Sequence, residues 1–286
     1  MNSSLKEKFF SGVFFCAALA SVIAVALICV FLLANGIPAM KEIGFFQFFC
    51  GTHWSPTDSP AEFGILPMIL GSLYVTGGAI LIGISIGVLT AIFMARFCPK
   101  SFYKFLKPCV DILAGIPSVV YGFFGLVVLV PFIRMNFGGS GSSILTASLL
   151  LGLMILPTVI GVSEAAIRVV PNSYYEGALA LGATHERSVF FATLPAAKSG
   201  IMAAIVLGIG RAVGETMAVI LVAGNQARVP GGILDGVRTL TANIVLEMGY
   251  AADLHREALI ATGVVLFVFV LMINALFSIL KRRNSA

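Results

Sequence analysis

The chain has 286 residues, of which 59% are hydrophobic and only 11% are charged. Soluble domains carry charges on roughly a quarter of their residues, so this composition excludes a soluble globular protein and predicts an integral membrane protein. The three histidines and five cysteines show no metal-ligand spacing, and the sequence contains no Gly-x-x-x-x-Gly-Lys phosphate loop. We therefore expect no metal or other cofactor, and any ATP used must be hydrolysed by another polypeptide.

Apolar runs long enough to cross a bilayer, which takes about 20 residues, predict about six transmembrane helices. They cover residues 9–33, 65–95, 110–133, 144–167, 201–224 and 258–280. The expected fold class is thus an all-α integral membrane protein. Residues 1–64 would form the first transmembrane helix and an outer connection, and residues 65–286 a core of five transmembrane helices.

Lysine and arginine predict the orientation of these helices. The connections on one side of the predicted membrane are rich in basic residues: Lys6, Lys8, Arg96, Lys100, Lys104, Lys107, Arg168, Arg187, Lys198, Lys281, Arg282 and Arg283. Those on the other side carry only Lys41, Arg134, Arg228, Arg238 and Arg256. Because basic loops stay in the cytoplasm, both termini are expected there. This asymmetry accounts for the net charge of +5, so the expected partner is the lipid bilayer and not nucleic acid.

The outer connection, residues 35–64, is rich in aromatic side chains. They are Phe45, Phe46, Phe48, Phe49 and Trp54. Rings of this kind gather where a membrane meets water, so we expect them to anchor the connection in an interfacial belt.

The longest polar interruption on the cytoplasmic side, residues 171–199, predicts two short helices. Ser173 and Glu176 have the spacing of a capping box, and Gly182 would supply a left-handed stop. Thr184 would cap the second helix. A helix of about eight residues is marginal by itself in water, so these helices need a surface to pack against.

Two predicted spans contain unusual polar or kinked segments. In the third span, Gly115-Ile116-Pro117-Ser118-Val119-Val120-Tyr121-Gly122 should break the helix, since Pro117 lacks an N–H. In the fifth span, Arg211 and Glu215 stand four residues apart on what would be one helix face. Each such charge costs roughly 2.5–3.5 kcal/mol in a membrane, so we expect this face to look into the protein. The alternative for this pair is a buried structural ion pair.

Two further acid–base pairs have helical spacing near the cytoplasmic ends of spans. Glu164 precedes Arg168 by four residues, and Lys107 precedes Asp111 by four. Both spacings suit surface ion pairs worth a few tenths of a kcal/mol, so a structural role is expected for each.

Several of these segments resemble known transport proteins. The polar stretch resembles the coupling loop of ABC importer permeases (E-A-A, three residues, G, nine residues, I-x-L-P) at Glu176, Gly177, Ala178, Gly182, Leu194 and Pro195; it departs at Gly177 and Ala192, where the family has alanine and isoleucine. The Pro-Ser-Val-Val-Tyr-Gly string resembles permeases of the phosphate-specific transport (Pst) system. Gly-Glu-Thr-Met at residues 214–217 is similar to their C-type subunit.

The resemblance implies a type I ABC importer permease core in a bacterial inner membrane, with residues 171–199 as the cytoplasmic coupling helix that docks on an ATPase subunit. It implies a second, unlike permease subunit, two ATPase subunits and a periplasmic phosphate-binding protein. The chain itself would be a non-catalytic subunit that moves phosphate by alternating access. The substrate path would include Arg211, Glu215, Pro117, Ser118 and Tyr121.

Other functions stay open on the sequence. The substrate could be another oxyanion, such as phosphonate, molybdate or sulfate. An ion channel would need pore-lining charges or carbonyl rings but no coupling loop. A membrane enzyme would need a nucleophile with a histidine or carboxylate pair inside the spans, and His53, His185 and His255 fall outside the predicted ones.

Overall fold

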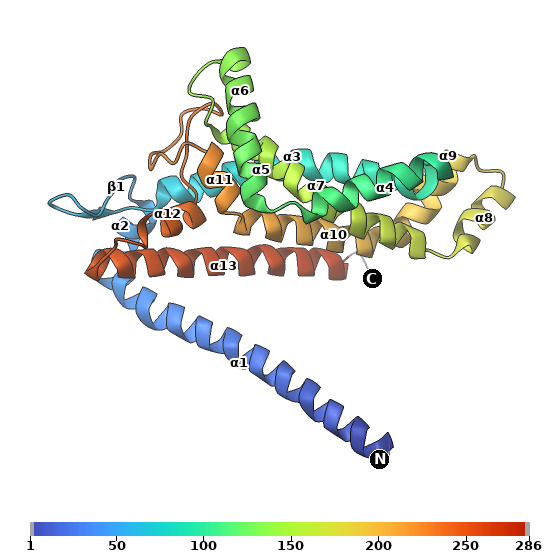
Figure 1. Ribbon diagram of the computed structural model, residues 1–286, viewed down its shortest axis with the longest axis horizontal. Helices are drawn as coiled ribbons and strands as arrows, with labels where there is room; N and C mark the ends of the chain where they lie inside the picture. Colours follow the sequence, from blue (N-terminus) through green and yellow to red (C-terminus); the bar gives the residue numbers. More distant parts are fainter. Residues whose placement is uncertain (1–2, 284–286) are drawn as a thin grey trace.

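The computed structural model describes residues 3–283; residues 1–2 and 284–286 lie outside it, as do the side chains of residues 3–6, 8, 276–278 and 280–283, among them Lys6, Lys8 and the basic residues 281–283. The chain is almost entirely helical (Figure 1). The α-helices are α1 (Ser3–Ile43), α2 (Phe45–Cys50), α3 (Leu66–Ile92), α4 (Lys100–Gly115), α5 (Ser118–Phe124), α6 (Val130–Phe137), α7 (Ile144–Val169), α8 (Asn172–Ala180), α9 (His185–Ser188), α10 (Leu194–Gly214), α11 (Met217–Val222), α12 (Leu240–Glu247) and α13 (Asp253–Arg283). Two short antiparallel strands, β1 (Trp54–Ser55) and β2 (Glu62–Phe63), lie in the outer connection.

Six helices of the described chain are long and apolar enough to cross a membrane, as predicted. They cover Phe9–Ile43, Leu66–Phe97, Ser118–Phe137, Ile144–Val169, His185–Gly214 and Asp253–Ala275. The third and fifth differ from their expected ranges. The third begins at Ser118 because the chain bends at Pro117, and the fifth ends at Gly214 because Glu215 has extended backbone angles.

Three π-helical segments interrupt the long helices, and each ends two residues before a proline. They are η1 (Phe93–Phe97), η2 (Gly125–Leu129) and η3 (Val189–Thr193). A proline offers no N–H to the carbonyl four residues earlier and its ring crowds that carbonyl, so the wider π turn accommodates it. In consequence α9 continues through η3 into α10, and the predicted separate second helix of the coupling stretch is instead the start of the fifth span.

Small residues bring α3, α7 and α10 close together at the centre of the molecule. A Cβ on Gly83 of α3 would lie 2.5 Å from Ile155 of α7, and one on Gly208 of α10 would lie 2.8 Å from Val159. These three helices form the rigid frame on which the polar residues of the spans are mounted.

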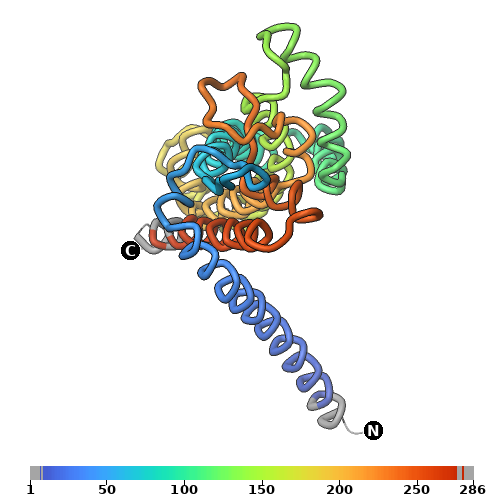
Figure 2. The backbone as a smooth tube through the Cα atoms, turned by 90° about the vertical axis from the view of Figure 1, so that its left-hand side faces the viewer, coloured from blue at the N-terminus to red at the C-terminus, as the bar shows by residue number. Residues whose placement is uncertain are grey.

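Helix α1 leaves this frame and meets α13 only near its own C-terminal end (Figures 1 and 2). There Gly36 packs against Ala261 and Val264. Large apolar side chains from Phe9 to Phe31 are exposed, as expected for a helix whose surroundings are lipid or another subunit. The start of α1 and the end of α13 lie in the half of the molecule that carries α8 and α9 (Figure 1).

The chain changes direction where α4 ends and α5 begins. Helix α4 runs beside the frame, whereas α5, η2 and α6 turn away from it and α6 projects from the bundle (Figures 1 and 2). Pro117 has extended angles at this bend and α5 starts at Ser118, so the predicted break in the third span is confirmed. The near part of the projecting arm is held because Gly122 lies against Ala218 of α11.

Candidate translocation path and coupling surface

Arg211 lies in the last turn of α10, where the fifth span breaks before α11. Its guanidinium donates from Nη1 to the hydroxyl Oγ1 of Thr158 on α7, over 3.1 Å. Among the described residues this neutral hydroxyl is the only side chain that meets the charge in a hydrogen bond or ion pair. A half-buried guanidinium with five donors is thus left largely without protein partners.

Glu215 does not pair with Arg211 in the described structure, contrary to the predicted ion pair on one helix face. Helix α10 ends at Gly214, and Glu215 has φ −70° and ψ 130°. Its Oε1 accepts the backbone N–H of Ala218 over 3.1 Å, which satisfies a donor in the first turn of α11. Helical spacing therefore no longer brings the two side chains together.

The α10 surface beside Arg211 is not covered by the rest of the chain. No described atom lies within 4 Å of the place that a Cβ would take on Gly210 or Gly214. Parts of α7 and α10 thus come together around one open, positively charged position.

The remaining predicted path residues shape the bend in the third span. The buried Tyr121 donates its hydroxyl to the carbonyl of Leu113 over 2.9 Å, across the break at Pro117. Ser118 is half-buried at the first position of α5. Tyr121 therefore fixes the angle between α4 and α5, a role that spacing alone did not indicate.

The coupling stretch is exposed and its elbow has the predicted geometry. Gly182 has φ +83°, its N–H bonds the Leu179 carbonyl over 2.8 Å, and the Ala183 N–H bonds the Ala178 carbonyl over 3.1 Å. These two bonds form a Schellman motif. Thr184 accepts the N–H of Arg187 as the predicted cap.

The beginning of α8 differs from the prediction. The helix starts at Asn172 after an extended Pro171, so Ser173 lies inside the first turn and makes no capping bond. The capping box with Glu176 is therefore not formed. Pro171, with its preset φ, takes the N-cap position without a side-chain hydrogen bond, so the helix begins two residues earlier than a cap at Ser173 would give.

None of the α8 residues is buried, and the elbow presents apolar side chains to the outside. Leu181 is 91% exposed and Phe191 77% exposed. Glu176, Gly177 and Pro195 are exposed too, while Ala178 and Leu194 are half-buried. A hydrogen bond of 2.7 Å between Tyr175 and His185 ties α8 to α9, so the stretch is a preformed surface whose outer face the described part of the chain leaves uncovered.

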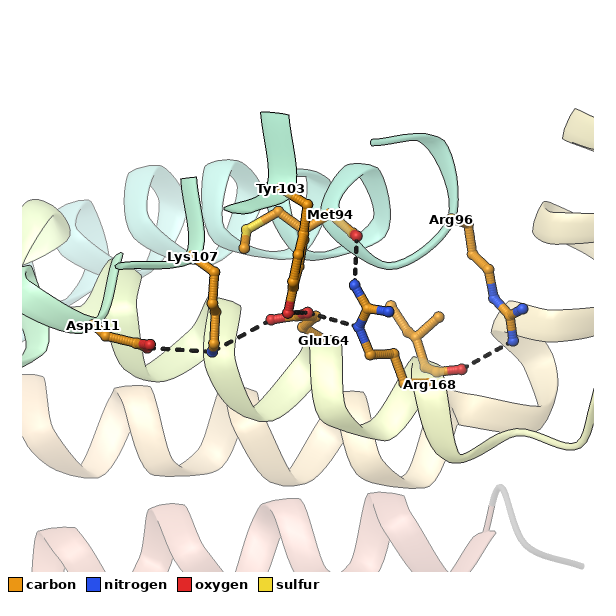
Figure 3. Close-up of polar contacts among 8 residues, drawn as sticks. Met94, Arg96, Tyr103, Lys107, Asp111, Glu164 and Arg168 are labelled. Atoms are coloured by element: carbon orange, nitrogen blue, oxygen red, sulfur yellow. Dashed lines mark hydrogen bonds and ion pairs between the residues drawn. The ribbon is translucent and has the colours of Figure 1, made fainter. Parts of the chain in front are cut away.

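Glu164, near the end of α7, is the centre of a polar cluster that sequence reasoning found only in part (Figure 3). Its side chain is 3% exposed and accepts from the Tyr103 hydroxyl over 2.6 Å and from Arg168 Nε over 2.7 Å. Lys107 Nζ lies 3.5 Å from it and 3.2 Å from Asp111. The two predicted i,i+4 pairs are confirmed, and the structure joins them into one network between α4 and α7.

The same network reaches the coupling stretch. Arg168 also donates to the Met94 carbonyl over 3.0 Å. Arg96 in η1 donates to the Ile167 carbonyl over 3.2 Å and to Oδ1 of Asn172, the first residue of α8, over 3.5 Å. The hydrogen bond to Glu164 is the main reason why the pKa of Tyr103 is raised, since deprotonation would bring two negative charges together. Tyr103 therefore keeps its proton and remains a donor well above neutral pH.

A second buried cluster, centred on Glu247 of α12, corrects the predicted aromatic belt. Trp54 is 7% exposed, and its indole N–H donates to Glu247 Oε2 over 2.8 Å. Arg238 and His255 contact the same carboxylate. Phe48 is fully buried, whereas Phe45 and Phe46 are exposed and fit the predicted position. A buried indole N–H usually finds a hydrogen-bond acceptor, here the carboxylate of a distant segment. No local sequence pattern predicts this partner.

Comparisons with known proteins agree with this architecture. The family of binding-protein-dependent transport system inner membrane components matches residues 83–286. A probable ABC transporter permease protein of Bacillus subtilis (strain 168), YqgH, is 40% identical over 91% of this chain and 87% of its own length. The phosphate transport system permease protein PstC of Mesorhizobium japonicum is 31% identical over 99% of this chain and 92% of its own.

Solved structures share the fold at low identity. A chain of a bacterial alginate ABC transporter, in complex with an alginate-bound periplasmic protein, has a TM-score of 0.67 and 17% identity over 97% of this chain and 96% of its own. A chain of the inward-facing MetNI methionine ABC transporter has a TM-score of 0.60 and 21% identity over 75% of this chain and 93% of its own. This chain belongs to the binding-protein-dependent transport system inner membrane components: it is a multi-pass, non-catalytic permease subunit of an ABC transporter, which works with an ATPase and a binding protein.

Proposed function

We propose that the chain is the C-type membrane subunit of an ATP-driven phosphate importer in a bacterial inner membrane. Its partners are a second, unlike permease subunit, a pair of cytoplasmic ATPase subunits and a periplasmic phosphate-binding protein. Both termini face the cytoplasm. The similarity to PstC over nearly the whole of both chains supports phosphate as the substrate.

The observation that carries the proposal is the weakly partnered charge of Arg211. A tetrahedral oxyanion that crosses a low-dielectric interior needs a positive partner, and a guanidinium offers a planar fork that matches two of its oxygens. A charge inside a membrane span costs free energy, and charges that occur there usually mark a substrate or ion pathway. In the proposed path the anion becomes the missing partner of Arg211.

The other path residues let the site release its ligand. Glu215 uses Oε1 for the Ala218 N–H, which leaves Oε2 to draw Arg211 away from the anion after the helices have moved. The bend at Pro117 and Ser118 is the hinge about which α4 and α5 change their angle once the hydrogen bond from Tyr121 to the Leu113 carbonyl opens. ATP-driven closure of the ATPase pair moves the coupling stretch and so exposes the path alternately to the two sides.

Transport by the purified complex tests the substrate. The chain is expressed with its partner subunits, reconstituted in proteoliposomes with ATP inside, and supplied with phosphate-loaded binding protein outside. We expect ATP-dependent uptake of radioactive phosphate that sulfate, molybdate and phosphonates do not inhibit at tenfold excess. Uptake of one of these anions in place of phosphate would reassign the substrate but keep the permease function.

Gly182 and Gly177 provide a matched test of coupling. Gly182 has a positive φ that costs other residues roughly 1 kcal/mol or more, so Gly182→Val should misplace α8, abolish uptake and weaken ATPase association. Gly177 is helical with open space around it, so Gly177→Ala should leave uptake intact. Full uptake by Gly182→Val would contradict docking through this elbow.

Impermeant thiol labelling tests the orientation in a variant without native cysteines. Single cysteines at the exposed positions Ser59 and Arg228 should react from outside, and one at the exposed Ser173 should react only after the membrane is opened. Outside labelling at Ser173 would contradict cytoplasmic termini.

A further inference from the structure

Thr158 is the one side chain in the described part of the chain that forms a hydrogen bond with Arg211, and it behaves unlike another threonine in the spans. Threonine in a helix commonly donates its hydroxyl to the carbonyl four residues earlier. Thr262 in α13 does so, to the Ala258 carbonyl over 2.9 Å. In the described chain Thr158 makes no such bond, and its Oγ1 accepts from Arg211 Nη1. Because the oxygen accepts, the hydroxyl proton remains free to donate elsewhere.

The frame holds Thr158 and Arg211 at a fixed separation. Val159, the next residue of α7, lies in the close contact with Gly208 of α10, one turn before Arg211. A contact this tight leaves the two helices little freedom to slide. The 3.1 Å between Nη1 and Oγ1 is thus set by backbone packing and does not depend on a flexible surface pair.

The space next to both residues is open. No described atom lies within 4 Å of a Cβ position on Gly161, one turn beyond Thr158, or on Gly214, one turn beyond Arg211. An anion in this space would meet the guanidinium from α10 and the hydroxyl from α7. Two donors that lie 3.1 Å apart can each reach a different oxygen of one tetrahedral anion.

We propose that Thr158 is a second anion-binding residue of the path, which positions Arg211 through its oxygen and donates its proton to an oxyanion. The inference rests on the proposed function, because it presumes that Arg211 binds the transported anion. It adds a donor from another helix, so that two helices of the rigid frame hold the anion together; release then depends on Glu215, which can compete with the anion for Arg211. The hydroxyl is neutral and therefore leaves the positive charge available to the anion.

Valine and serine replacements separate the hydroxyl from the shape of the residue. In proteoliposomes with saturating phosphate-loaded binding protein, Thr158→Val should lower the maximal rate of phosphate uptake about tenfold, the effect of one hydrogen bond to a charged group. The rate of ATP hydrolysis and the membrane abundance should stay unchanged, so fewer phosphate ions cross per ATP. Thr158→Ser restores a hydroxyl and should remain within about twofold of the wild type.

The control is Thr262→Val, which removes a hydroxyl that bonds only within its own helix and should keep the wild-type ratio of phosphate to ATP. A wild-type ratio in Thr158→Val, together with loss of uptake in Arg211→Gln, would overturn the role of Thr158 and leave the proposed function standing. Phosphate uptake by Arg211→Gln would instead overturn the proposed function. Equal loss of abundance in Thr158→Val and Thr158→Ser would show a purely structural role and also overturn the inference.

Discussion

Glu164 and Arg211 are both charged residues within the helical bundle, and they differ in how many side chains partner them. Glu164 is 3% exposed and has Tyr103, Arg168 and Lys107 around it. In the described chain, Arg211 forms a hydrogen bond with one side chain, the neutral hydroxyl of Thr158. A buried charge that is fully partnered contributes to structure, whereas one left short of partners is held ready for something that the chain does not contain.

The surroundings explain this difference. Glu164 lies where α4, α7 and η1 converge near the coupling stretch, and Arg96 and Arg168 extend its network to backbone carbonyls (Figure 3). The network joins α4, α7 and η1 into one rigid unit. Rigidity there suits the proposed role of transmitting the movement of the ATPase. Arg211 lies where a helix ends and glycines leave space, which suits a part that must exchange ligands.

Replacement of Arg211 should have the largest effect on transport. Arg211→Gln should abolish phosphate uptake while the protein still reaches the membrane, because the charge interacts with the anion more than with the fold. Arg211→Lys should retain little uptake, since an ammonium lacks the planar fork. Phosphate uptake in proteoliposomes measures the first effect, and an immunoblot of the membrane fraction measures the second. Wild-type uptake by Arg211→Gln would contradict a functional role of Arg211 that Glu164 lacks.

The double variant Arg211→Gln with Glu215→Gln sharpens the same point. If the two charges were a structural pair, removal of both would leave no unpaired buried charge and should restore transport. Since they do not pair in the described structure, we expect uptake to stay lost. Recovery of uptake would show that Arg211 is not a substrate contact.

Replacement of Glu164 should lower the stability of the protein and leave transport by the folded molecules unchanged. Glu164→Ala should lower the free energy of unfolding by about 2–4 kcal/mol, because Arg168 and Lys107 lose their carboxylate and Tyr103 its acceptor. Thermal unfolding of the purified complex measures this loss, and the ratio of phosphate to ATP should stay normal in the molecules that fold. Glu257→Ala, at an exposed position of α13, is the control and should stay within about 0.5 kcal/mol.

The smallest effect is expected for Tyr103→Phe. It removes one hydrogen bond to the Glu164 carboxylate and keeps the ring under Arg168, whose Cζ lies 4.5 Å from the ring centre. A loss of about 1–2 kcal/mol in the free energy of unfolding is expected. Tyr74→Phe, with a half-exposed and unbonded hydroxyl, should cost almost nothing. Equal stability of Tyr103→Phe and the wild type would weaken the structural assignment of the cluster.

The sequence by itself determined the features that depend on local chemistry. Runs of apolar residues predicted six spans, and the structure confirms six in its described part. Pro117 and Gly182 predicted a break and a left-handed stop, and both occur because the missing N–H and the positive φ are properties of single residues. Thr184 caps its helix for the same reason.

Only the tertiary structure decided which polar side chains of distant segments meet. The sequence offered Glu215 as the partner of Arg211 on the assumption of an unbroken helix, but α10 ends between them and Thr158, 53 residues away, takes that place. Trp54 reaches Glu247 across 193 residues, and Tyr103 reaches Glu164 across 61. The first pair follows from the packing of α7 against α10 at Gly208, and the other two from the packing of β1 with α12 and of α4 with α7. No local pattern encodes the register in which distant segments meet.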